Sequence, residues 1–177
     1  TESLAEVEDI LNSGVRWKII DLRTAEAFKQ GHIPEAHNVW RTDITDTTYP
    51  YGGMMPTQLH TELLLSKLGI VPSDTILIYD EKADCDAARL WWVLKFYGHP
   101  HIKLLNGGLK AWVAAKGQLS NLEAKPEPSN YQFLAQPDST IHASADFVLS
   151  VLSKDEVILL DTRGDEEFNG KLKDGAA

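Results

Sequence analysis

Apolar and polar positions alternate in blocks along the first 120 residues, and these blocks predict short strands separated by helices. Apolar runs with the length of buried strands occupy residues 17–20, 38–40, 76–79 and 102–105. Apolar residues at helical spacing occupy residues 1–13, 24–28, 57–68, 87–97 and 109–116. Strands that alternate with helices favour a parallel sheet with helices on both faces. We therefore expect an α/β fold of three layers, with a central parallel sheet of about five strands flanked by helices.

Residues that start or stop helices mark several of these boundaries. Ser3 and Glu6 have the spacing of a capping box, which predicts that the first helix runs from residue 1 to residue 13. Thr24 and Thr57 are expected N-caps, and Gly98 stands where a helix commonly ends in a glycine. In the helix after Thr57 the buried face is expected to consist of Leu59, Leu63, Leu64 and Leu68.

Residues 75–98 organise the rest of the chain. The apolar run ends at Asp80, a short polar loop from Glu81 to Asp86 follows, and a helical pattern continues to Tyr97. Backbone N–H groups of such a loop and the positive end of the helix converge on one point, so the loop favours an anion or a thiolate. Asp84 and Asp86 are candidate N-caps.

Cys85 is the chain's only cysteine and lies in this loop. A thiol at a helix N-terminus can be held as a thiolate, which makes Cys85 a candidate carrier of sulfur. Its late position in the loop and its neighbours Asp84 and Asp86 oppose that role. The alternative interpretation is a buried structural thiol.

Arg89 and the tryptophans after it are candidates for contact with a substrate or a second domain. Arg89 either attracts an anionic substrate in a cleft between domains or pairs with Asp80 or Asp21. Trp91 and Trp92 are consecutive and so point to different sides of the helix. We expect one of them in the core and assign Trp92 to the contact with a second domain.

Asp21 and Arg23 stand at the C-terminal end of the first long strand, where a parallel sheet has its ligand crevice. The sequences EAF at 26–28 and GHIP at 31–34 follow them. His32 is either a general base or a structural histidine whose ring fixes the turn near Asp21 or Arg23.

The sequences DLR at 21–23, GHIP at 31–34 and AARLWW at 87–92 resemble those of the rhodanese family of sulfurtransferases, and the resemblance covers nearly the whole chain. It implies a rhodanese-like domain, in which the loop begins with a nucleophilic cysteine that carries a persulfide. Counting back from Gly98, Glu81 stands at that position. The loop therefore resembles that of the inactive N-terminal domain of two-domain rhodaneses and mercaptopyruvate sulfurtransferases, a degenerate active-site loop consisting of Glu81, Lys82, Ala83, Asp84, Cys85 and Asp86.

The chain then repeats itself. The sequence IIDLRTAEAF at 19–28 matches LLDTRGDEEF at 159–168, so that Asp161 and Arg163 correspond to Asp21 and Arg23. The matching positions of the two copies are separated by the same number of residues throughout, which indicates a duplicated domain. We expect three parts: a rhodanese-like domain without a catalytic cysteine at 1–120, a proline-rich linker at 121–138 with a short strand at 131–133, and the truncated beginning of a second rhodanese-like domain at 139–177.

The composition of the chain disfavours several classes of binding partner. The net charge of −9 and pI of about 5.1 disfavour nucleic acid and anionic membranes. No apolar stretch approaches the roughly 20 residues of a membrane span, and the histidines lack the spacing of a zinc site. We expect a cytoplasmic protein without metal, and the resemblance implies no organic cofactor. The sequence leaves the oligomeric state open.

The resemblance implies a sulfurtransferase that moves a sulfane sulfur from thiosulfate or 3-mercaptopyruvate to cyanide or a thiol acceptor, through a cysteine persulfide in the second domain beyond residue 177. Arg89, Trp92 and Arg163 are then expected near the substrate or the domain interface. Glu167 departs from the second arginine of several mercaptopyruvate enzymes, which weakens the expectation of that donor. The alternatives are a non-catalytic rhodanese-like binding or regulatory module, and an enzyme that uses Cys85 directly.

Overall fold

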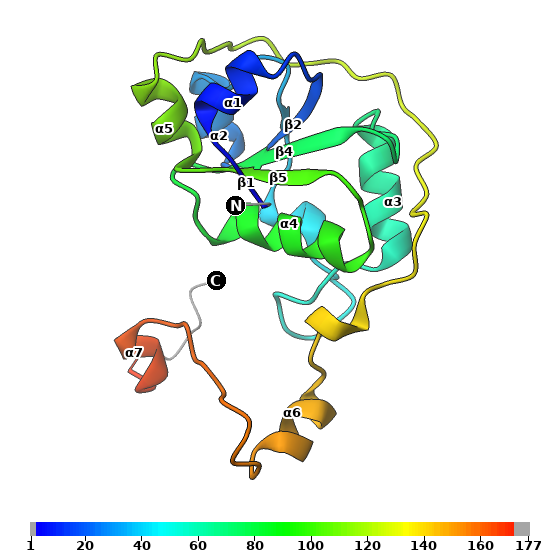
Figure 1. Cartoon of the computed structure of the whole chain (residues 1–177), viewed down its shortest axis with the longest axis vertical. Coiled ribbons are helices and arrows are strands. Elements are labelled where there is room, and N and C mark those ends of the chain that lie inside the picture. Colours follow the sequence, from blue (N-terminus) through cyan, green and yellow to red (C-terminus); the bar gives the residue numbers. More distant parts are fainter. Residues whose placement is uncertain (1–2, 172–177) are drawn as a thin grey trace. The chain divides into compact units, whose positions relative to one another are not determined.

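The computed structural model describes residues 3–171 and divides the chain into two compact units, residues 1–138 and 139–177. One fully parallel sheet in the first unit has the strand order β1-β5-β4-β2-β3 (Figure 1). The strands are β1 (Leu4–Ala5), β2 (Trp17–Asp21), β3 (His37–Asn38), β4 (Thr75–Tyr79) and β5 (Ile102–Leu105). The predicted α/β fold with a parallel sheet of about five strands is confirmed, although β3 begins one residue earlier than expected and is shorter.

Helices cover both faces of this sheet. They are α3 (Gln58–Lys67) and α4 (Cys85–Phe96) on one face, and α1 (Val7–Asn12), α2 (Ala25–Gln30) and α5 (Gly108–Ala114) on the other. Successive residues of β4 serve the two cores in turn: Ile76 and Ile78 pack with α3 and α4, whereas Leu77 and Tyr79 pack with the other three helices. The continuous apolar run of β4 is therefore explained by burial on both faces.

The first helix begins later than the capping box predicts. α1 begins at Val7 with Glu6 as its N-cap residue, and Leu4–Ala5 form an edge strand against β5. The N–H of Leu104 donates to the carbonyl oxygen of Ser3 at 2.9 Å, so Ser3 extends along the sheet. The predicted start was wrong because pairing with a sheet edge satisfies the backbone that another helical turn would have used. Residues 1 and 2 of the predicted helix lie outside the described residues.

α3 buries a different face from the predicted one. Thr61 and Leu65 are buried, whereas Leu59 and Leu63 are 65% and 63% exposed. The prediction failed for these two leucines because the helix has apolar residues on more than one of its sides. The sequence pattern alone does not then show which side is buried. The other two predicted leucines do contact the core, and Thr57 caps the helix as expected.

The proline-rich segment after α5 packs along the first unit (Figure 1). We call residues 118–138 the strap. Ser120 and His32 exchange two backbone hydrogen bonds of 2.8 Å, and the N–H of Tyr131 donates to Ser66 Oγ at 2.9 Å. Tyr131 is buried. The short strand predicted at 131–133 is not formed, because the N–H groups of Tyr131 and Phe133 donate to the side chains of Ser66 and Glu62 rather than to a strand.

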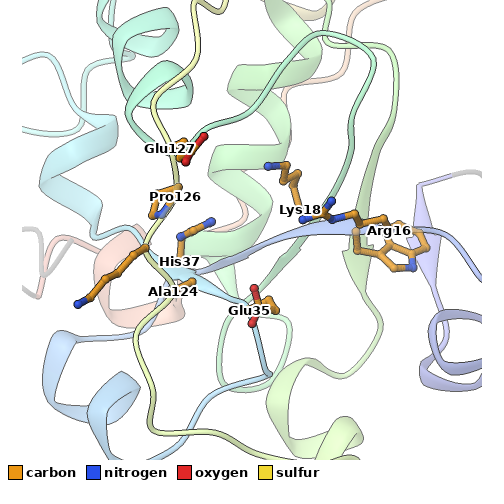
Figure 2. A pocket seen from close by; sticks show the side chains of 9 residues that line it. Arg16, Lys18, Glu35, His37, Ala124, Pro126 and Glu127 are labelled. Carbon is orange, nitrogen blue, oxygen red and sulfur yellow. The ribbon is translucent and has the colours of Figure 1, made fainter.

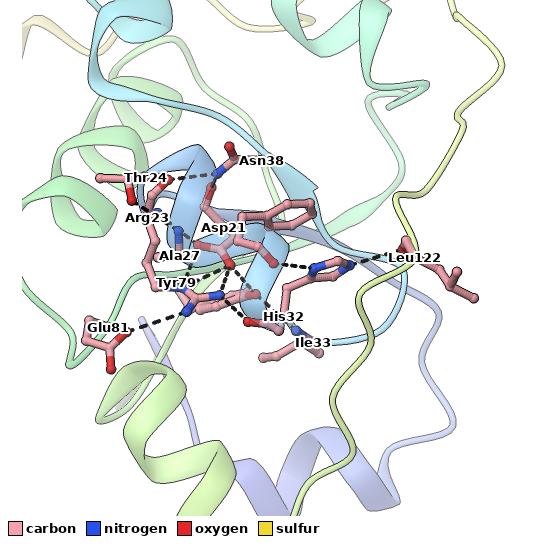
Figure 3. A network of polar contacts seen from close by, with 12 residues as sticks. Asp21, Arg23, Thr24, Ala27, His32, Ile33, Asn38, Tyr79, Glu81 and Leu122 are labelled. Atoms are coloured by element: carbon pink, nitrogen blue, oxygen red, sulfur yellow. Dashed lines mark hydrogen bonds and ion pairs between the residues drawn. The ribbon is translucent and has the colours of Figure 1, made fainter.

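His32 anchors the strap to the turn before β3. Its ring is fully buried and stacks on Phe28 with 3.7 Å between ring centroids. Nδ1 lies 2.8 Å from the carbonyl oxygen of Phe28, and Nε2 lies 3.1 Å from that of Leu122 (Figure 3). These contacts give His32 a structural role, but with different partners from the predicted Asp21 and Arg23.

His99 fastens the middle of the strap and should make stability pH-dependent. Its Nδ1 lies 2.7 Å from the Tyr131 hydroxyl, and its Nε2 lies 3.0 Å from the carbonyl oxygen of Asp74. Burial lowers the pKa of His99, so the imidazole of His99 is protonated at a higher pH in the unfolded chain than in the folded chain. The stabilisation is complete above the unfolded pKa of about 6.5 and is lost as the pH falls below it.

We therefore expect the free energy of unfolding to fall between pH 7 and pH 5, as measured by urea denaturation, and to fall by less in His99→Gln. Equal decreases in the two proteins would show that another group controls the response.

The second unit has a helical beginning without a sheet. Its elements are the 3-10 helix η2 (Ser139–Ile141), α6 (Ala145–Val151) and α7 (Asp165–Phe168), and no strand forms within its described residues. Ser144 caps α6 by accepting a hydrogen bond from the N–H of Phe147 at 3.2 Å. Ile158 and Leu160, in the run that matches β2, are 81% and 83% exposed. Across residues 3–171, no helix is both long and apolar enough to pass through a membrane.

Candidate active-site crevice

The C-terminal ends of β2 and β4 border a cavity of about 250 Å³, at the place where parallel α/β sheets bind ligands. It is lined by Leu22, Arg23, Thr24, Ala27, Trp40, Asp80, Glu81, Asp84 and Asp86. Four of these side chains are carboxylates and only one is a cation. The lining therefore disfavours a small anion.

The Asp21–Arg23 motif forms a buried ion pair at the end of β2 (Figure 3). Arg23 Nη2 donates to Asp21 Oδ2 and to the carbonyl oxygen of Gly31, both at 2.7 Å. The Tyr79 hydroxyl donates to the same carboxylate oxygen at 2.5 Å. Burial opposes the charge of Arg23, but the hydrogen bond and charge of Asp21 outweigh it and raise the pKa of Arg23. Asp21 thus joins β2 to β4 and fixes the turn that leads to Gly31.

Burial and the charge of Asp21 also raise the pKa of Tyr79. The Tyr79 hydroxyl accepts a hydrogen bond from the N–H of Ile33 at 3.1 Å while it donates to Asp21. Tyr79 is therefore a neutral structural link. Sequence analysis missed it because a tyrosine inside an apolar strand looks like any other core residue.

Asp80 occupies the point on which the N–H groups of the loop converge. Its Oδ1 accepts from the N–H groups of Lys82 at 3.3 Å and Asp84 at 2.8 Å, and its Oδ2 accepts from that of Ala87 at 3.1 Å. The residue is only 4% exposed. The loop therefore already holds an anion, supplied by its own chain, where the sequence predicted a site for an external anion or a thiolate.

The opposite side of the loop is fixed by α5. The N–H groups of Leu109 and Lys110 donate to the carbonyl oxygens of Asp80 and Glu81, at 2.9 and 3.0 Å. A Cβ atom on Gly108 would lie 2.6 Å from the carbonyl oxygen of Asp80, so only glycine permits this approach. The Asp80 carboxylate is thus held within a rigid loop.

Glu81 does not take the position that counting along the sequence predicts. Its side chain is 55% exposed, and its Oε2 lies 3.5 Å from Arg23 Nη1. The acidic residue that fills the loop is Asp80, one position earlier. The correction has a physical reason: Asp80 directly follows β4 and its side chain is buried, whereas the side chain of Glu81 already turns outward.

Cys85 is exposed at the first turn of α4. Arg41, in the 3-10 helix η1 (Arg41–Ile44), places Nη2 3.9 Å from the Cys85 sulfur. The same Nη2 lies 2.8 Å from Asp86 Oδ1, so a carboxylate offsets its charge. Cys85 is therefore neither the predicted buried thiol nor a thiol aimed at the centre of the loop. Asp84 is the N-cap residue by position, but its side chain makes no capping bond.

Arg89 pairs with neither of the aspartates predicted for it. Its Nη2 donates to the carbonyl oxygens of Gly53 and Met54 at 2.8 and 3.0 Å, which fastens the loop at 45–56 to α4. Burial lowers the pKa of Arg89, and the charge of Arg41 contributes to this effect. Trp91 packs against the core, and Trp92 stacks on Phe96 at 5.8 Å between ring centroids. A contact of Trp92 with a second domain stays a prediction.

The second copy of the motif has the same local geometry in a different environment. Arg163 Nη2 lies 2.6 Å from Asp161 Oδ2, and the N–H of Arg163 donates to Asp161 Oδ1 at 3.0 Å. The hydrogen bond from Arg163 holds the pKa of Asp161 at about 2. Asp161 and Arg163 therefore form the same ion pair and hydrogen bond without a surrounding core. The role predicted for Arg163 near a substrate stays a prediction.

No group of three or more His, Cys, Asp or Glu side chains could hold a metal ion within residues 3–171.

Of the site residues, sequence analysis missed Asp80, Tyr79 and Arg41. Asp80 carried one usable signal, because a short acidic side chain directly after a buried strand commonly accepts N–H groups from the next residues.

Comparison with known proteins gives this geometry a context. The profile of the family described as "Rhodanese-like domain" matches residues 3–115. A curated relative in Mycobacterium leprae, named "Putative thiosulfate sulfurtransferase SseA", is 34% identical over 142 residues, which cover 80% of this chain and 46% of the relative. A "Putative thiosulfate sulfurtransferase" of Mycolicibacterium smegmatis is 33% identical over 147 residues, 82% of this chain and 51% of the relative. The chain thus spans about half the length of these relatives.

Solved structures share the fold. The 3-mercaptopyruvate sulfurtransferase SseA of Escherichia coli is 24% identical with a TM-score of 0.71, over 85% of this chain and 63% of that one. An anaerobic ergothioneine biosynthesis enzyme of Chlorobium limicola is 21% identical with a TM-score of 0.80, over 97% of this chain and 46% of that one.

Proposed function

Because the chain belongs to the rhodanese-like domain family, we propose that it is the non-catalytic part of a tandem-domain sulfurtransferase. In this proposal, residues 1–138 provide the wall and the structural support of the active site. A second rhodanese-like domain, which begins within residues 139–177, provides the nucleophilic cysteine. The sulfurtransferase names of the relatives and the repeated Asp-x-Arg motif support this assignment.

One observation carries the proposal: the Asp80 carboxylate accepts hydrogen bonds from three backbone N–H groups, two in the loop and one in the first turn of α4. A persulfide or an anionic sulfur donor would need those same donors and would meet a like charge. The loop of the first unit is therefore unsuited to sulfur transfer, even though its strand, loop and helix are complete.

The proposed reaction moves a sulfane sulfur from a small anionic donor, thiosulfate or 3-mercaptopyruvate, to cyanide or a thiol. The second-domain cysteine attacks the donor's sulfur and becomes a persulfide, and the remainder of the donor leaves. The acceptor then attacks the outer sulfur and releases the cysteine thiolate. No metal or organic cofactor takes part, and we propose that the enzyme works in the cytoplasm.

Thiocyanate formation from thiosulfate and cyanide tests this proposal. We expect no activity above the blank from the 177-residue chain, and turnover from a protein that continues through the second domain. Activity of the short chain would contradict the proposal. Inactivity of the longer protein with both thiosulfate and 3-mercaptopyruvate would instead favour the binding or regulatory module.

An enzyme that uses Cys85 is the second candidate, since Cys85 is exposed and has a guanidinium 3.9 Å away. We expect Cys85→Ser to leave kcat of the two-domain protein within about twofold, because Asp86 offsets the charge of Arg41 and Asp80 fills the loop. A loss of about a hundredfold, or about 2.7 kcal/mol in the barrier, would identify Cys85 as the nucleophile.

A further inference from the structure

A cavity of about 580 Å³ lies away from the crevice, between β2, the turn before β3 and the strap (Figure 2). Trp17 and Lys18, which begin β2, line one side of it, whereas the crevice lies where β2 ends. Its volume is within the usual range for sites that bind small molecules. The proposed sulfur transfer makes no use of it.

Charged side chains of both signs line this cavity. Figure 2 shows Arg16 and Lys18 on one side, Glu35 below them, and His37 on the opposite side next to Ala124 and Pro126. None of the five charged lining residues, Arg16, Lys18, Glu35, Lys125 and Glu127, forms an ion pair within residues 3–171. Lys18 Nζ donates to the carbonyl oxygen of Gly69 at 2.7 Å and keeps two further N–H groups. Cations and a carboxylate that share a cavity without pairing leave donors and acceptors for a ligand.

His37 lines the cavity together with Lys18 and Glu35, whose charges act on its ring. Burial lowers its pKa, and the charge of Lys18 lowers it further, against a smaller opposite effect of Glu35. The charge of Lys18 therefore acts on the imidazole more strongly than that of Glu35. Within an acidic protein of net charge −9, this is a place where a carboxylate is favoured.

Glu35 is held in a conformation that glycine would adopt without strain. Its φ is 66°, in the left-handed region, which is unfavourable for a residue with a Cβ atom. Strain at a residue whose side chain faces a cavity points to a use for that side chain. A carboxylate at this position can bind an ammonium group.

The strap fixes the rim of the cavity through a close contact with Gly69. A Cβ atom on Gly69 would lie 2.5 Å from the carbonyl oxygen of Glu127, so the strap approaches the end of α3 more closely than any other residue would allow. Ala124, Lys125, Pro126 and Glu127 of the strap line the cavity at this rim. The cavity is therefore a built part of the fold.

We propose that this cavity binds a small zwitterion of the amino-acid or short-peptide class, with its carboxylate on Arg16 and Lys18 and its ammonium group on Glu35. A simple anion would leave Glu35 and Glu127 without a partner, and a simple cation would leave Arg16, Lys18 and Lys125 without one. Only a ligand with both charges satisfies both sets of groups at once.

Nuclear magnetic resonance of the His37 ring in the 177-residue chain tests the proposal. Glycine and triglycine serve as zwitterions with short and long charge separation, and acetate and ethylammonium serve as matched single charges. We expect saturable shifts of the His37 signals with at least one zwitterion, and binding at least about tenfold weaker for both single charges. Acetate that binds as tightly as the zwitterions, or no saturable shift with any of the four probes, would overturn the proposal.

Variants assign the two ends of the ligand. Arg16→Gln and Glu35→Gln should each raise Kd of the bound zwitterion at least about fivefold. Lys110→Gln, which removes an exposed cation outside the cavity, should leave Kd unchanged. Backbone spectra check that each variant is folded. An unchanged Kd in both cavity variants would contradict the assigned contacts.

Discussion

Asp21→Asn is expected to lower the free energy of unfolding of the 177-residue chain by about 3–5 kcal/mol, because it leaves the charge of Arg23 buried without its partner. Asp21 is fully buried and accepts from Arg23 and from the Tyr79 hydroxyl. An asparagine would present an N–H group or one neutral oxygen to these donors. A loss of this size is a large part of the stability of a typical domain.

The chain contains its own matched control. Asp161→Asn makes the same change in the same local motif, but the Arg163 side chain there is 58% exposed instead of 8% at Arg23. Exposed pairs contribute little, so we expect no measurable change in stability. Urea denaturation followed by far-ultraviolet circular dichroism would report both units. Equal losses in the two variants, or no loss in Asp21→Asn, would show that burial does not determine the importance of this ion pair.

Asp80→Ala is expected to destabilise the first unit by about 3 kcal/mol, because three backbone N–H groups lose a charged acceptor. Glu81→Ala removes the neighbouring acidic side chain, which is 55% exposed, and should change stability by no more than about 0.5 kcal/mol. The pair of variants separates the residue that fills the loop from the one that sequence counting places there.

Sulfate provides a second measurement on the same variant. If Asp80 acts as an internal anion, Asp80→Ala leaves an empty site that sulfate can enter. Sulfate should then stabilise Asp80→Ala more than the wild-type chain at equal ionic strength, as binding to the folded state requires. An equal gain in both proteins would reflect only the general effect of this salt and would contradict the interpretation of Asp80.

Much of the fold could be predicted from periodicity. The four apolar runs and the caps at Thr24 and Thr57 are local features, and each appears in the structure. The two-residue edge strand β1 could not be predicted, because its formation depends on the position of β5, which is far away in sequence. The buried face of α3 could not be predicted for a similar reason. The helix has leucines on more than one side, and only the neighbouring elements decide which of them are buried.

The candidate site was harder to predict than the fold. The sequence located the loop and showed that it lacks a cysteine at its start, but not which acidic side chain turns inward. The packing of the strap against the first unit could not be predicted from its composition, since prolines and polar residues are typical of a free linker. Its attachment uses backbone carbonyls and the missing side chain of Gly69, which leave no pattern in the sequence.

The position of the persulfide tests the central claim most directly. The two-domain protein would be incubated with thiosulfate, alkylated to trap persulfides, digested with trypsin and analysed by mass spectrometry. Cleavage after Lys82 and Arg89 isolates Cys85 in the peptide ADCDAAR. Our account predicts an extra sulfur atom on a cysteine outside residues 1–177 and none on this peptide. An extra sulfur atom on Cys85, lost again when cyanide is added, would contradict it.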